Sequence, residues 1–258
     1  MPLLILIDFD QTITTRDTIG ALGKFGVSYT HNPTPWSYFV DSYLDDYRQH
    51  LPAAAAADRD FKAFVEQQLD SYQPIERASQ ARVSQHKVFE GLTRHALTQQ
   101  ASALRAEYLQ PGVISTLKAY RDQVRIVSLN WSKDWIQGFL QDLDVPKQHI
   151  YSNDLEFDDD SGKCTGNIVP AILTAGDKQR VINTFRHHDN KTIYIGDSLG
   201  DIEALVEADV GIIIGKDTSL LDALDNFGYA VEQNINQPST LYRVDDWDQI
   251  NQLLQQHQ

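Results

Sequence analysis

Four short apolar segments constrain the fold of this chain more than any other feature of its sequence. They are rich in β-branched residues and do not alternate between apolar and polar positions, so we predict strands buried on both faces, as in a parallel sheet. The segments are LLILID (3–8), VRIVSL (124–129), KTIYIGD (191–197) and VGIIIG (210–215). Helical patterns between and after them cover 111–123, 131–143, 177–188 and 198–208. This alternation predicts an α/β fold with a doubly wound parallel sheet.

One long segment, residues 15–109, interrupts the alternation. It contains no convincing strand, and it carries a proline-containing stretch, HNPTPW, and an alanine run, PAAAAAD, before helix-compatible sequence from Arg59 to Tyr108. We therefore predict a helical insert after the first strand. The expected organisation is a core domain formed by 1–14 and 110–258 and a helical domain formed by 15–109.

An apolar face with helical spacing lies within this insert. Its members are Trp36, Phe39, Val40, Tyr43, Leu44 and Tyr47. One interpretation is that these side chains form the core of the insert. The other is that some of the rings line a substrate pocket.

Two further local patterns lie after the second helical segment and near the end of the chain. Residues 150–169 read as two strands joined by an acidic turn, which predicts a hairpin. The turn residues Asp158, Asp159 and Asp160 are interpreted as solvated rather than bound to calcium. The stretch DDWDQINQLL predicts a short terminal helix capped by Asp245 or Asp246.

Composition excludes several classes of partner. Lysine and arginine number 22 against 36 aspartates and glutamates, which gives a net charge of −14. Such a surface repels phosphate backbones and anionic lipid, so neither nucleic acid nor a membrane is an expected partner. The single cysteine, Cys164, suits a reducing compartment. The apolar run 3–7 is too short for a membrane span and has neither the basic flank nor the cleavage site of a signal peptide. The expected location is the cytoplasm.

Polar side chains gather where the predicted strands end. Because ligands of a parallel sheet bind outside the carboxyl ends of its strands, these side chains are expected to meet at one site. They are Asp8 and Asp10, Ser128, and Asp197 followed by Asp201. Carboxylates that converge repel one another, and a bound cation relieves this; ligands that are all oxygen favour Mg²⁺. Lys178, at an expected helix start, adds a positive charge, so the set is typical of a phosphoryl site.

The order of these residues resembles the four motifs of the haloacid dehalogenase (HAD) superfamily. The corresponding elements are DFDQT (8–12), the strand that ends in Ser128, Lys178, and GDSLGD (196–201). The resemblance implies a Rossmann-like core, and an insert directly after the first motif corresponds to a type 1 cap, as in the phosphoserine-phosphatase-like branch. A mobile helical lid of this kind would exclude water and select small substrates. Gln11 departs from the glycine common at its position in the superfamily, although this branch varies there.

The resemblance also implies roles for individual residues. Asp8 matches the nucleophile that forms an aspartyl phosphate, and Asp10 matches the general acid that protonates the leaving group and then activates water. Family members with dehalogenase activity lack the second aspartate, so Asp10 favours phosphatase chemistry. The implied magnesium ligands are Asp8, Asp10 through its backbone carbonyl, Asp197 and Asp201. The residues implied to bind the substrate or its phosphate are Thr12, Asp17, Ser128, Asn130 and Lys178.

A narrower resemblance bears on the substrate, a small phosphorylated metabolite. The stretches IVSLNWSKDWIQGFL, YSNDLEFDDDSGKCTG and YIGDSLGDIEALVEADVGIIIG resemble the HAD domain that plants fuse to a thiaminase-II-like domain and that acts as a thiamin monophosphate phosphatase. Thiamin monophosphate is cationic and aromatic, so Asp17, Trp131 and the aromatic face at 36–47 would suit it by charge and stacking. Asp17 is equally interpreted as a helix N-cap, and Trp131 as packing against the cap.

Two other classes of protein share part of this pattern of residues. A receiver-type signalling domain also gathers aspartates, a hydroxyl and a lysine at strand ends, but it is about half this length. A HAD-fold protein that has lost catalysis and acts as a binding module is the stronger alternative. Such a protein would lack at least one of Asp8, Asp10, Lys178 and Asp197, and all four are present.

Overall fold

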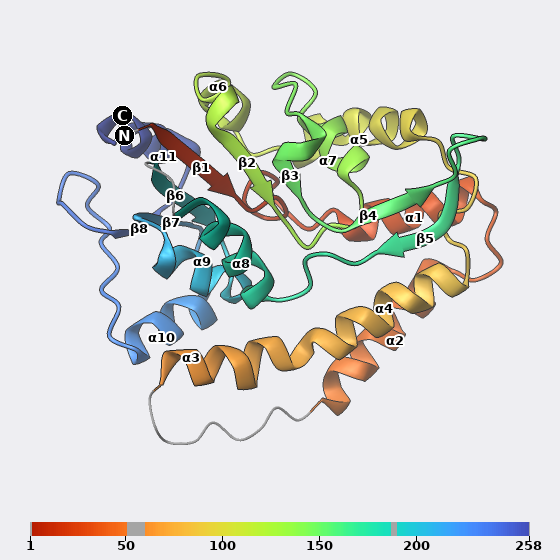
Figure 1. The fold of residues 1–258 in the computed structure, drawn as a ribbon, viewed down its shortest axis with the longest axis horizontal. Helices are drawn as coiled ribbons and strands as arrows, with labels where there is room; N and C mark the ends of the chain where they lie inside the picture. Colours follow the sequence, from red (N-terminus) through yellow and green to blue (C-terminus); the bar gives the residue numbers. More distant parts are fainter. Residues whose placement is uncertain (1, 51–59, 187–189, 258) are drawn as a thin grey trace.

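The computed structural model describes residues 2–50, 60–186 and 190–257, and its centre is a six-stranded sheet (Figure 1). The strand order is β3-β2-β1-β6-β7-β8, and every neighbouring pair is parallel. The strands are β1 (Leu3–Ile7), β2 (Val124–Val127), β3 (Ile150–Tyr151), β6 (Lys191–Gly196), β7 (Val210–Ile214) and β8 (Leu241–Val244). The predicted α/β fold with a doubly wound parallel sheet is confirmed, and its four predicted strands are β1, β2, β6 and β7.

Both faces of the sheet are covered, as the unbroken apolar strands require. Leu3, Ile5 and Ile7 of β1 pack into one apolar cluster, whereas Leu4 and Leu6 pack into another. The first cluster contains buried side chains of α6 (Val113–Lys118), α7 (Lys133–Phe139) and α11 (Trp247–Gln256). The second contains those of α8 (Ala175–Arg186), α9 (Ile202–Glu207) and α10 (Thr218–Asn226). All strand ends at one edge of the sheet are thereby fixed by packing on two sides.

The predicted hairpin and terminal helix are present, with different bounds. The hairpin joins β4 (Asp154–Phe157) to β5 (Cys164–Val169) as a separate antiparallel pair. Residues 150–151 belong instead to the parallel sheet as β3, so the prediction that the hairpin begins at residue 150 is wrong. Helix α11 begins after Asp246, whose carboxylate accepts a hydrogen bond from the Gln249 backbone N–H at 2.9 Å. This capping is the reason the helix starts there.

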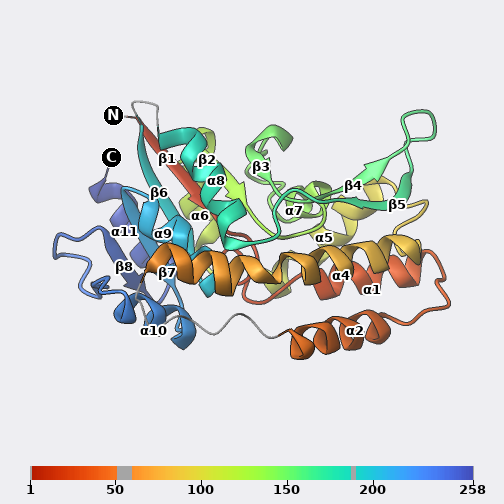
Figure 2. The same ribbon diagram turned by 60° about the horizontal axis from the view of Figure 1, so that its bottom comes forward.

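The regular elements formed by the described residues of the insert are all helices, apart from isolated bridges at Thr93 and Leu109. They are α1 (Ile19–Tyr29), α2 (Trp36–Gln49), α3 (Phe61–Phe64), α4 (Gln73–Gln85) and α5 (Arg94–Tyr108), with a π-helical turn (Val65–Leu69) and a 3₁₀ turn (Asp70–Tyr72) between α3 and α4. The run from α3 to α4 forms a nearly continuous rod, and α2 lies beside α4 (Figure 2). The alanine run lies outside the described residues.

The two ends of this rod touch different parts of the molecule. At α3, Phe61 meets the ring of Phe227, which follows α10. At α4, the Ser84 hydroxyl accepts a hydrogen bond from the Ile168 backbone N–H of β5 at 3.0 Å. The insert helices α1 and α5 also share the apolar cluster of α7, so the expected division into two domains crosses a continuous core. None of the helices formed by the described residues is both long enough and apolar enough to span a bilayer.

Candidate active site

The site begins where β1 ends. Asp8 is 5% exposed, and its backbone N–H donates to the carbonyl of Ile195 on β6 at 2.9 Å, so the last ladder contact of the sheet fixes this carboxylate. The chain then turns back, with the backbone N–H of Ile13 donating to the carbonyl of Phe9. Gln11 lies in this turn at φ 62°, a left-handed conformation that favours glycine. The glycine common at this position in the superfamily therefore has a conformational reason.

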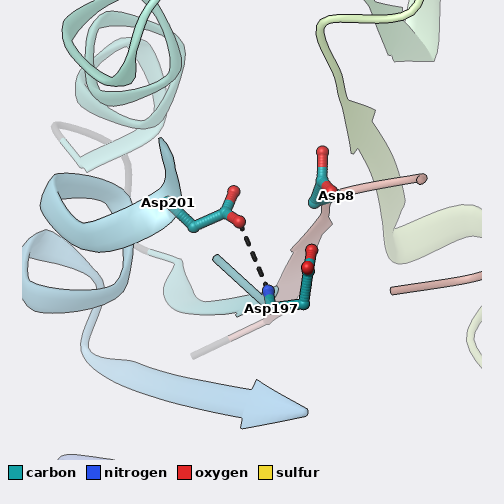
Figure 3. Close-up of side chains that lie close together, drawn as sticks. All are labelled: Asp8, Asp197 and Asp201. Atoms are coloured by element: carbon teal, nitrogen blue, oxygen red, sulfur yellow. Dashed lines mark hydrogen bonds between the residues drawn. The ribbon is translucent and has the colours of Figure 1, made fainter. Parts of the chain in front are cut away.

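Three carboxylates meet at this edge of the sheet (Figure 3). Asp8, Asp197 and Asp201 each offer an oxygen, and these atoms lie within 4.8 Å of one another. The Lys178 ammonium donates to Asp8 at 2.8 Å and to Asp201 at 2.7 Å, while the lysine itself is only 3% exposed. The structure thus brings together residues separated by up to 193 positions in the chain, which is the convergence that the strand ends predict.

Asp201 differs from the other two carboxylates because its oxygens are already occupied. One oxygen accepts from Lys178 and from the Tyr194 hydroxyl at 2.6 Å. The other accepts from the backbone N–H groups of Asp197 and Ser198 and from the Ser198 hydroxyl at 3.2–3.3 Å. A carboxylate has about four acceptor positions, so these five donors fill it. Tyr194, which the sequence reasoning missed, is thus a fixed part of the site.

The cluster is electrostatically unbalanced without a further cation. Burial, partly offset by Lys178, raises the pKa of Asp8 to about 6. Burial and the neighbouring charges of Asp201 and Asp8 raise the pKa of Asp197 to about 9. One lysine therefore does not compensate three carboxylates, and an additional cation would favour their ionised forms.

Asp10 lies in a different environment from Asp8, although only one residue separates them. Its carboxylate accepts from the Thr18 backbone N–H at 2.7 Å and from the Asn130 side-chain amide at 2.9 Å. The Thr18 hydroxyl in turn accepts from Asn130 at 3.0 Å and from the Trp135 indole at 3.2 Å. This network orients the Asp10 side chain by donors from the loop after β1 and the loop after β2. Burial and the charge of Asp17 raise its pKa to about 7.

The hydroxyl residues surround the carboxylates. Thr12 donates to Asp197 at 3.0 Å, and its carbonyl accepts from the Trp247 indole at 3.1 Å, which secures the turn against α11. Ser128, just after β2, is buried, and its oxygen accepts the Asn130 backbone N–H at 3.1 Å. Both Thr12 and Ser128 were predicted from the sequence to lie near the carboxylates and to bind phosphate.

The helix that carries Lys178 is held at its first turn by two aspartates. Asp177 accepts from the backbone N–H groups of Leu173 and Thr174 at 2.8 and 3.1 Å. Asp70, from the 3₁₀ turn of the insert, accepts from the Gly176 backbone N–H at 3.1 Å. This contact could not be predicted from local sequence patterns, because 106 residues separate its partners. The insert therefore touches the element that positions the lysine.

A pocket of about 480 Å³ adjoins this site. It is lined by Gln11, Asp17, Ile19, Gly20, Trp36, Phe39, Val40, Tyr43, Glu76, Ser79, Leu129 and Trp131. The members of the predicted apolar face fall into two groups. Those that line the pocket are Trp36, Phe39, Val40 and Tyr43, whereas Leu44 and Tyr47 lie outside its lining and are exposed. The interpretation that part of this face lines a pocket is correct.

The two further candidates on this side both lie in the pocket wall. Asp17 accepts from the Ile19 backbone N–H at 2.8 Å, as a residue at the start of α1 would, and it lines the pocket as well. Trp131 is 6% exposed and meets the Trp36 ring edge-on at 6.2 Å, so it both packs against the insert and borders the pocket. The N-cap of α1 is Thr18, so the interpretation of Asp17 as the N-cap is wrong by one residue, whereas both interpretations of Trp131 are compatible.

Comparison with known proteins gives the class to which this fold and site belong. The model of the haloacid dehalogenase-like hydrolases matches residues 5–205, and the chain belongs to this family. The match spans β1 with Asp8, β2, Lys178 and the turn that carries Asp197 and Asp201. The family and the fold together support a phosphatase.

Curated relatives are distant. A CTO1 family protein of Schizosaccharomyces pombe (strain 972 / ATCC 24843) is 26% identical over 281 residues, which cover 95% of this chain and 97% of the relative. The mitochondrial Bifunctional TH2 protein of Arabidopsis thaliana is 22% identical over 96% of this chain, and this match covers 48% of that protein. The chain thus spans about half the length of the plant relative.

Solved structures with the same fold include phosphoserine phosphatases. A substrate-bound phosphoserine phosphatase complex has a TM-score of 0.56 and 17% identity, with 98% of each chain covered. A phospho-aspartyl intermediate analogue of phosphoserine phosphatase has a TM-score of 0.54 and 17% identity, with 97% of this chain and 98% of that chain covered. The predicted resemblance to this branch of the superfamily is thereby confirmed at the level of the fold.

Proposed function

We propose that this protein is a magnesium-dependent phosphatase that hydrolyses a small phosphomonoester through an aspartyl phosphate on Asp8. The observation that carries the proposal is the buried contact of Lys178 with both Asp8 and Asp201, at 2.8 and 2.7 Å, beside Asp197. An ammonium group and converging carboxylate oxygens at the end of a parallel sheet suit the binding of a metal ion and a phosphoryl group.

The residues present fit a magnesium ion. Mg²⁺ prefers oxygen ligands, and the raised pKa values of Asp8 and Asp197, about 6 and 9, reflect carboxylates that lack a sufficient counter-charge. Asp8, Asp197 and the Asp10 backbone carbonyl would hold the ion. Asp201, whose oxygens are filled by protein donors, would position Lys178 and the backbone of Asp197 instead of binding the metal directly. The ion supplies positive charge against the phosphoryl oxygens.

The two aspartates of the first turn would divide the chemistry between them. Asp8, held by the sheet and by Lys178, attacks phosphorus, and the ester oxygen leaves as Asp10 gives it a proton. Asp10 then takes a proton from the water that hydrolyses the aspartyl phosphate. Its pKa of about 7 suits a group that must both donate and accept a proton near neutral pH. Thr12, Ser128, Asn130 and Lys178 would surround the phosphoryl oxygens or the carboxylates that contact them.

The insert would act as a cap that selects the substrate. Residues 15–109 contribute the aromatic side of the pocket through α2 and α4, while residues 1–14 and 110–258 contribute the catalytic groups. Asp17, Trp131 and the rings of α2 suit a cationic aromatic ester such as thiamin monophosphate, which also agrees with the resemblance to the plant HAD domain.

A substrate panel tests the proposal. Phosphate release is measured with and without Mg²⁺ from p-nitrophenyl phosphate, thiamin monophosphate, phosphoserine, pyridoxal phosphate and sugar phosphates, and the substrates are ranked by kcat/KM. We expect turnover that requires Mg²⁺ and is lost in Asp8→Asn by a factor of at least about 10³, because removal of a nucleophile eliminates the covalent route. Magnesium-independent turnover, or an Asp8→Asn variant of full activity, would refute the assignment.

A HAD-fold binding module remains the second candidate. It predicts substrate or product binding with no turnover of any member of the panel. The presence of Asp8, Asp10, Lys178 and Asp197 in one connected site favours the enzyme.

A further inference from the structure

The pocket beside the catalytic carboxylates is formed by two parts of the chain. The insert contributes α2 and α4, and the loops after β1 and β2 contribute Gln11 and Leu129. Gln11 follows Asp10, and Leu129 precedes Asn130, so the pocket opens next to the proposed proton-transfer residue. A substrate whose phosphate lies at Asp8 would therefore place its remaining part in this pocket.

One wall of the pocket carries a carboxylate, Glu76, that was not predicted from the sequence. Glu76 lies on α4 and accepts a hydrogen bond from the Tyr43 hydroxyl of α2 at 2.7 Å. Burial raises the pKa of Glu76, and burial also raises the pKa of Asp17, the second carboxylate of the lining. Among the described residues that line the pocket, none is lysine, arginine or histidine. Glu76 is thus partly desolvated, Asp17 keeps an exposed side chain, and neither has a cation beside it in the pocket wall.

Aromatic rings line the same pocket as these carboxylates. Trp36 meets Phe39 at 5.5 Å with an interplanar angle of 31°, and it meets Trp131 edge-on at 6.2 Å. Ring faces attract cations, and ring surfaces stack on flat groups. The pocket therefore combines two features that favour an organic cation, negative charge without a counter-ion and aromatic walls.

We propose that Glu76, held by Tyr43 and assisted by Asp17, selects phosphate monoesters whose alcohol part carries an organic cation. The inference rests on the proposed phosphatase function, since it assigns the specificity of the same site. Asp17 lies close enough to Asp10 for its charge to affect that carboxyl, so it is the carboxylate near the reacting end, and Glu76 is the one fixed on the insert. Neutral and anionic alcohol groups would leave the two carboxylates uncompensated.

A pair of substrates that differ only in charge tests the role of Glu76. Phosphocholine and its uncharged isostere, 3,3-dimethylbutyl phosphate, have the same shape, so the ratio of their kcat/KM values reports recognition of the charge. We expect the wild-type protein to favour phosphocholine and Glu76→Gln to lower the ratio at least about tenfold, because the amide keeps the shape and loses the charge. Glu76→Asp, which keeps the charge, should retain most of the preference.

A matched control separates recognition from structure. Asp41→Asn makes the same carboxylate-to-amide change on the exposed side of α2, outside the pocket lining, and should leave the ratio unchanged. Thermal unfolding of each variant shows whether it is folded. If Glu76→Gln lowers both kcat/KM values by the same factor, or leaves the ratio unaltered, Glu76 only fastens α2 to α4 and the inference is overturned.

Binding without phosphate distinguishes failure of this inference from failure of the proposed function. Isothermal titration with thiamin, a flat cation that lacks phosphate, does not require turnover. We expect the wild-type protein to bind thiamin and Glu76→Gln to bind it at least about tenfold more weakly. Absence of turnover with this binding pattern would refute the phosphatase and keep the cation pocket. Absence of thiamin binding by the wild-type protein, or equal binding by Glu76→Gln, would overturn the cation pocket.

Discussion

The carboxylate cluster and the aromatic pocket lie side by side, but different kinds of structure build them. Asp8 and Lys178 are fixed at the end of the sheet and are 5% and 3% exposed, with both charged groups in direct contact. Tyr43 and Glu76 lie on two helices of the insert and are only partly buried. Under the proposed function, the parallel sheet positions the catalytic groups, whereas the helices of the insert select what enters the pocket.

The two regions also differ in how their charges are compensated. In the cluster, the buried Lys178 pairs with two of the three carboxylates, Asp8 and Asp201. The other oxygen of Asp201 accepts hydrogen bonds from backbone N–H groups. In the pocket, the charge of Glu76 is met by a neutral tyrosine hydroxyl. We therefore propose that the cluster takes up a metal ion in addition to the protein's own groups, and that the pocket takes up a cation from the ligand.

Replacement of Asp10 gives the largest expected effect on this comparison. Asp10→Asn removes the proton donor and acceptor, so we expect kcat to fall about 10²- to 10⁴-fold. The loss should be the same for cationic and neutral substrates, because Asp10 belongs to the region that performs the chemistry. Steady-state kinetics on phosphocholine and 3,3-dimethylbutyl phosphate measure it. A loss under tenfold, or one confined to the cationic substrate, would break the distinction between the two regions.

The thermal stability of the protein should depend on pH and on metal binding through the carboxylate cluster. The pKa of Asp197 is raised to about 9 and that of Asp8 to about 6, so between about pH 4 and those values the folded protein binds more protons than the unfolded chain. Stability of the metal-free protein therefore falls as pH rises through this range. We expect Tm at pH 8.5 to lie below Tm at pH 6 by at least about 2–4 °C, the shift that accompanies about 1 kcal/mol in a protein of this size.

Magnesium should reverse this trend, because the ion takes the place of the protons. At about 100 times its Kd, a ligand stabilises the folded state by about 2.7 kcal/mol. Differential scanning fluorimetry across pH, with Mg²⁺ or with a chelator, measures the effect. Asp197→Asn should abolish the magnesium shift, and a shift that persists in this variant would place the ion elsewhere.

A pair of glycines in α1 provides the smallest and most local change. A Cβ at Gly23 would come within 2.3–2.4 Å of the Trp36 ring, whereas a Cβ at Gly20 would find the nearest atom of that ring at 4.0 Å. Gly23→Ala must therefore displace a wall of the pocket, and we expect a loss of about 1–3 kcal/mol in the free energy of unfolding together with a raised KM. Gly20→Ala should be neutral or stabilising in denaturant unfolding. Equal behaviour of the two variants would show that Trp36 does not define the pocket.

The sequence predicted the sheet side of this comparison much better than the helical side. Uninterrupted β-branched runs identified β1, β2, β6 and β7, because strands buried on both faces have no polar alternation. Strand β8 was missed, since LYRV is short and contains a charged residue, Arg243, whose side chain is only 16% exposed at the sheet edge. Helix α10 also went unpredicted, although Asp217 caps it by accepting from the Leu220 backbone N–H.

The same contrast holds for the functional residues. Asp8, Ser128 and Asp197 were predicted because each follows a recognisable strand, and the order of motifs identified Lys178. Glu76 and Tyr194 gave no such signal: Glu76 meets Tyr43 across two helices, and Tyr194 is one of several apolar-looking positions in β6. Their importance depends on tertiary contacts, which neither periodicity nor local spacing contains.

The most direct test of the central claim is a crystal structure of the protein with Mg²⁺ and beryllium fluoride, which mimics a phosphoryl group on a carboxylate. We expect beryllium to be bonded to an Asp8 oxygen and the fluorides to contact Lys178 and Ser128. We also expect a metal ion in contact with Asp8 and Asp197. Beryllium fluoride bound at another residue, or a metal ion away from Asp8 and Asp197, would contradict it.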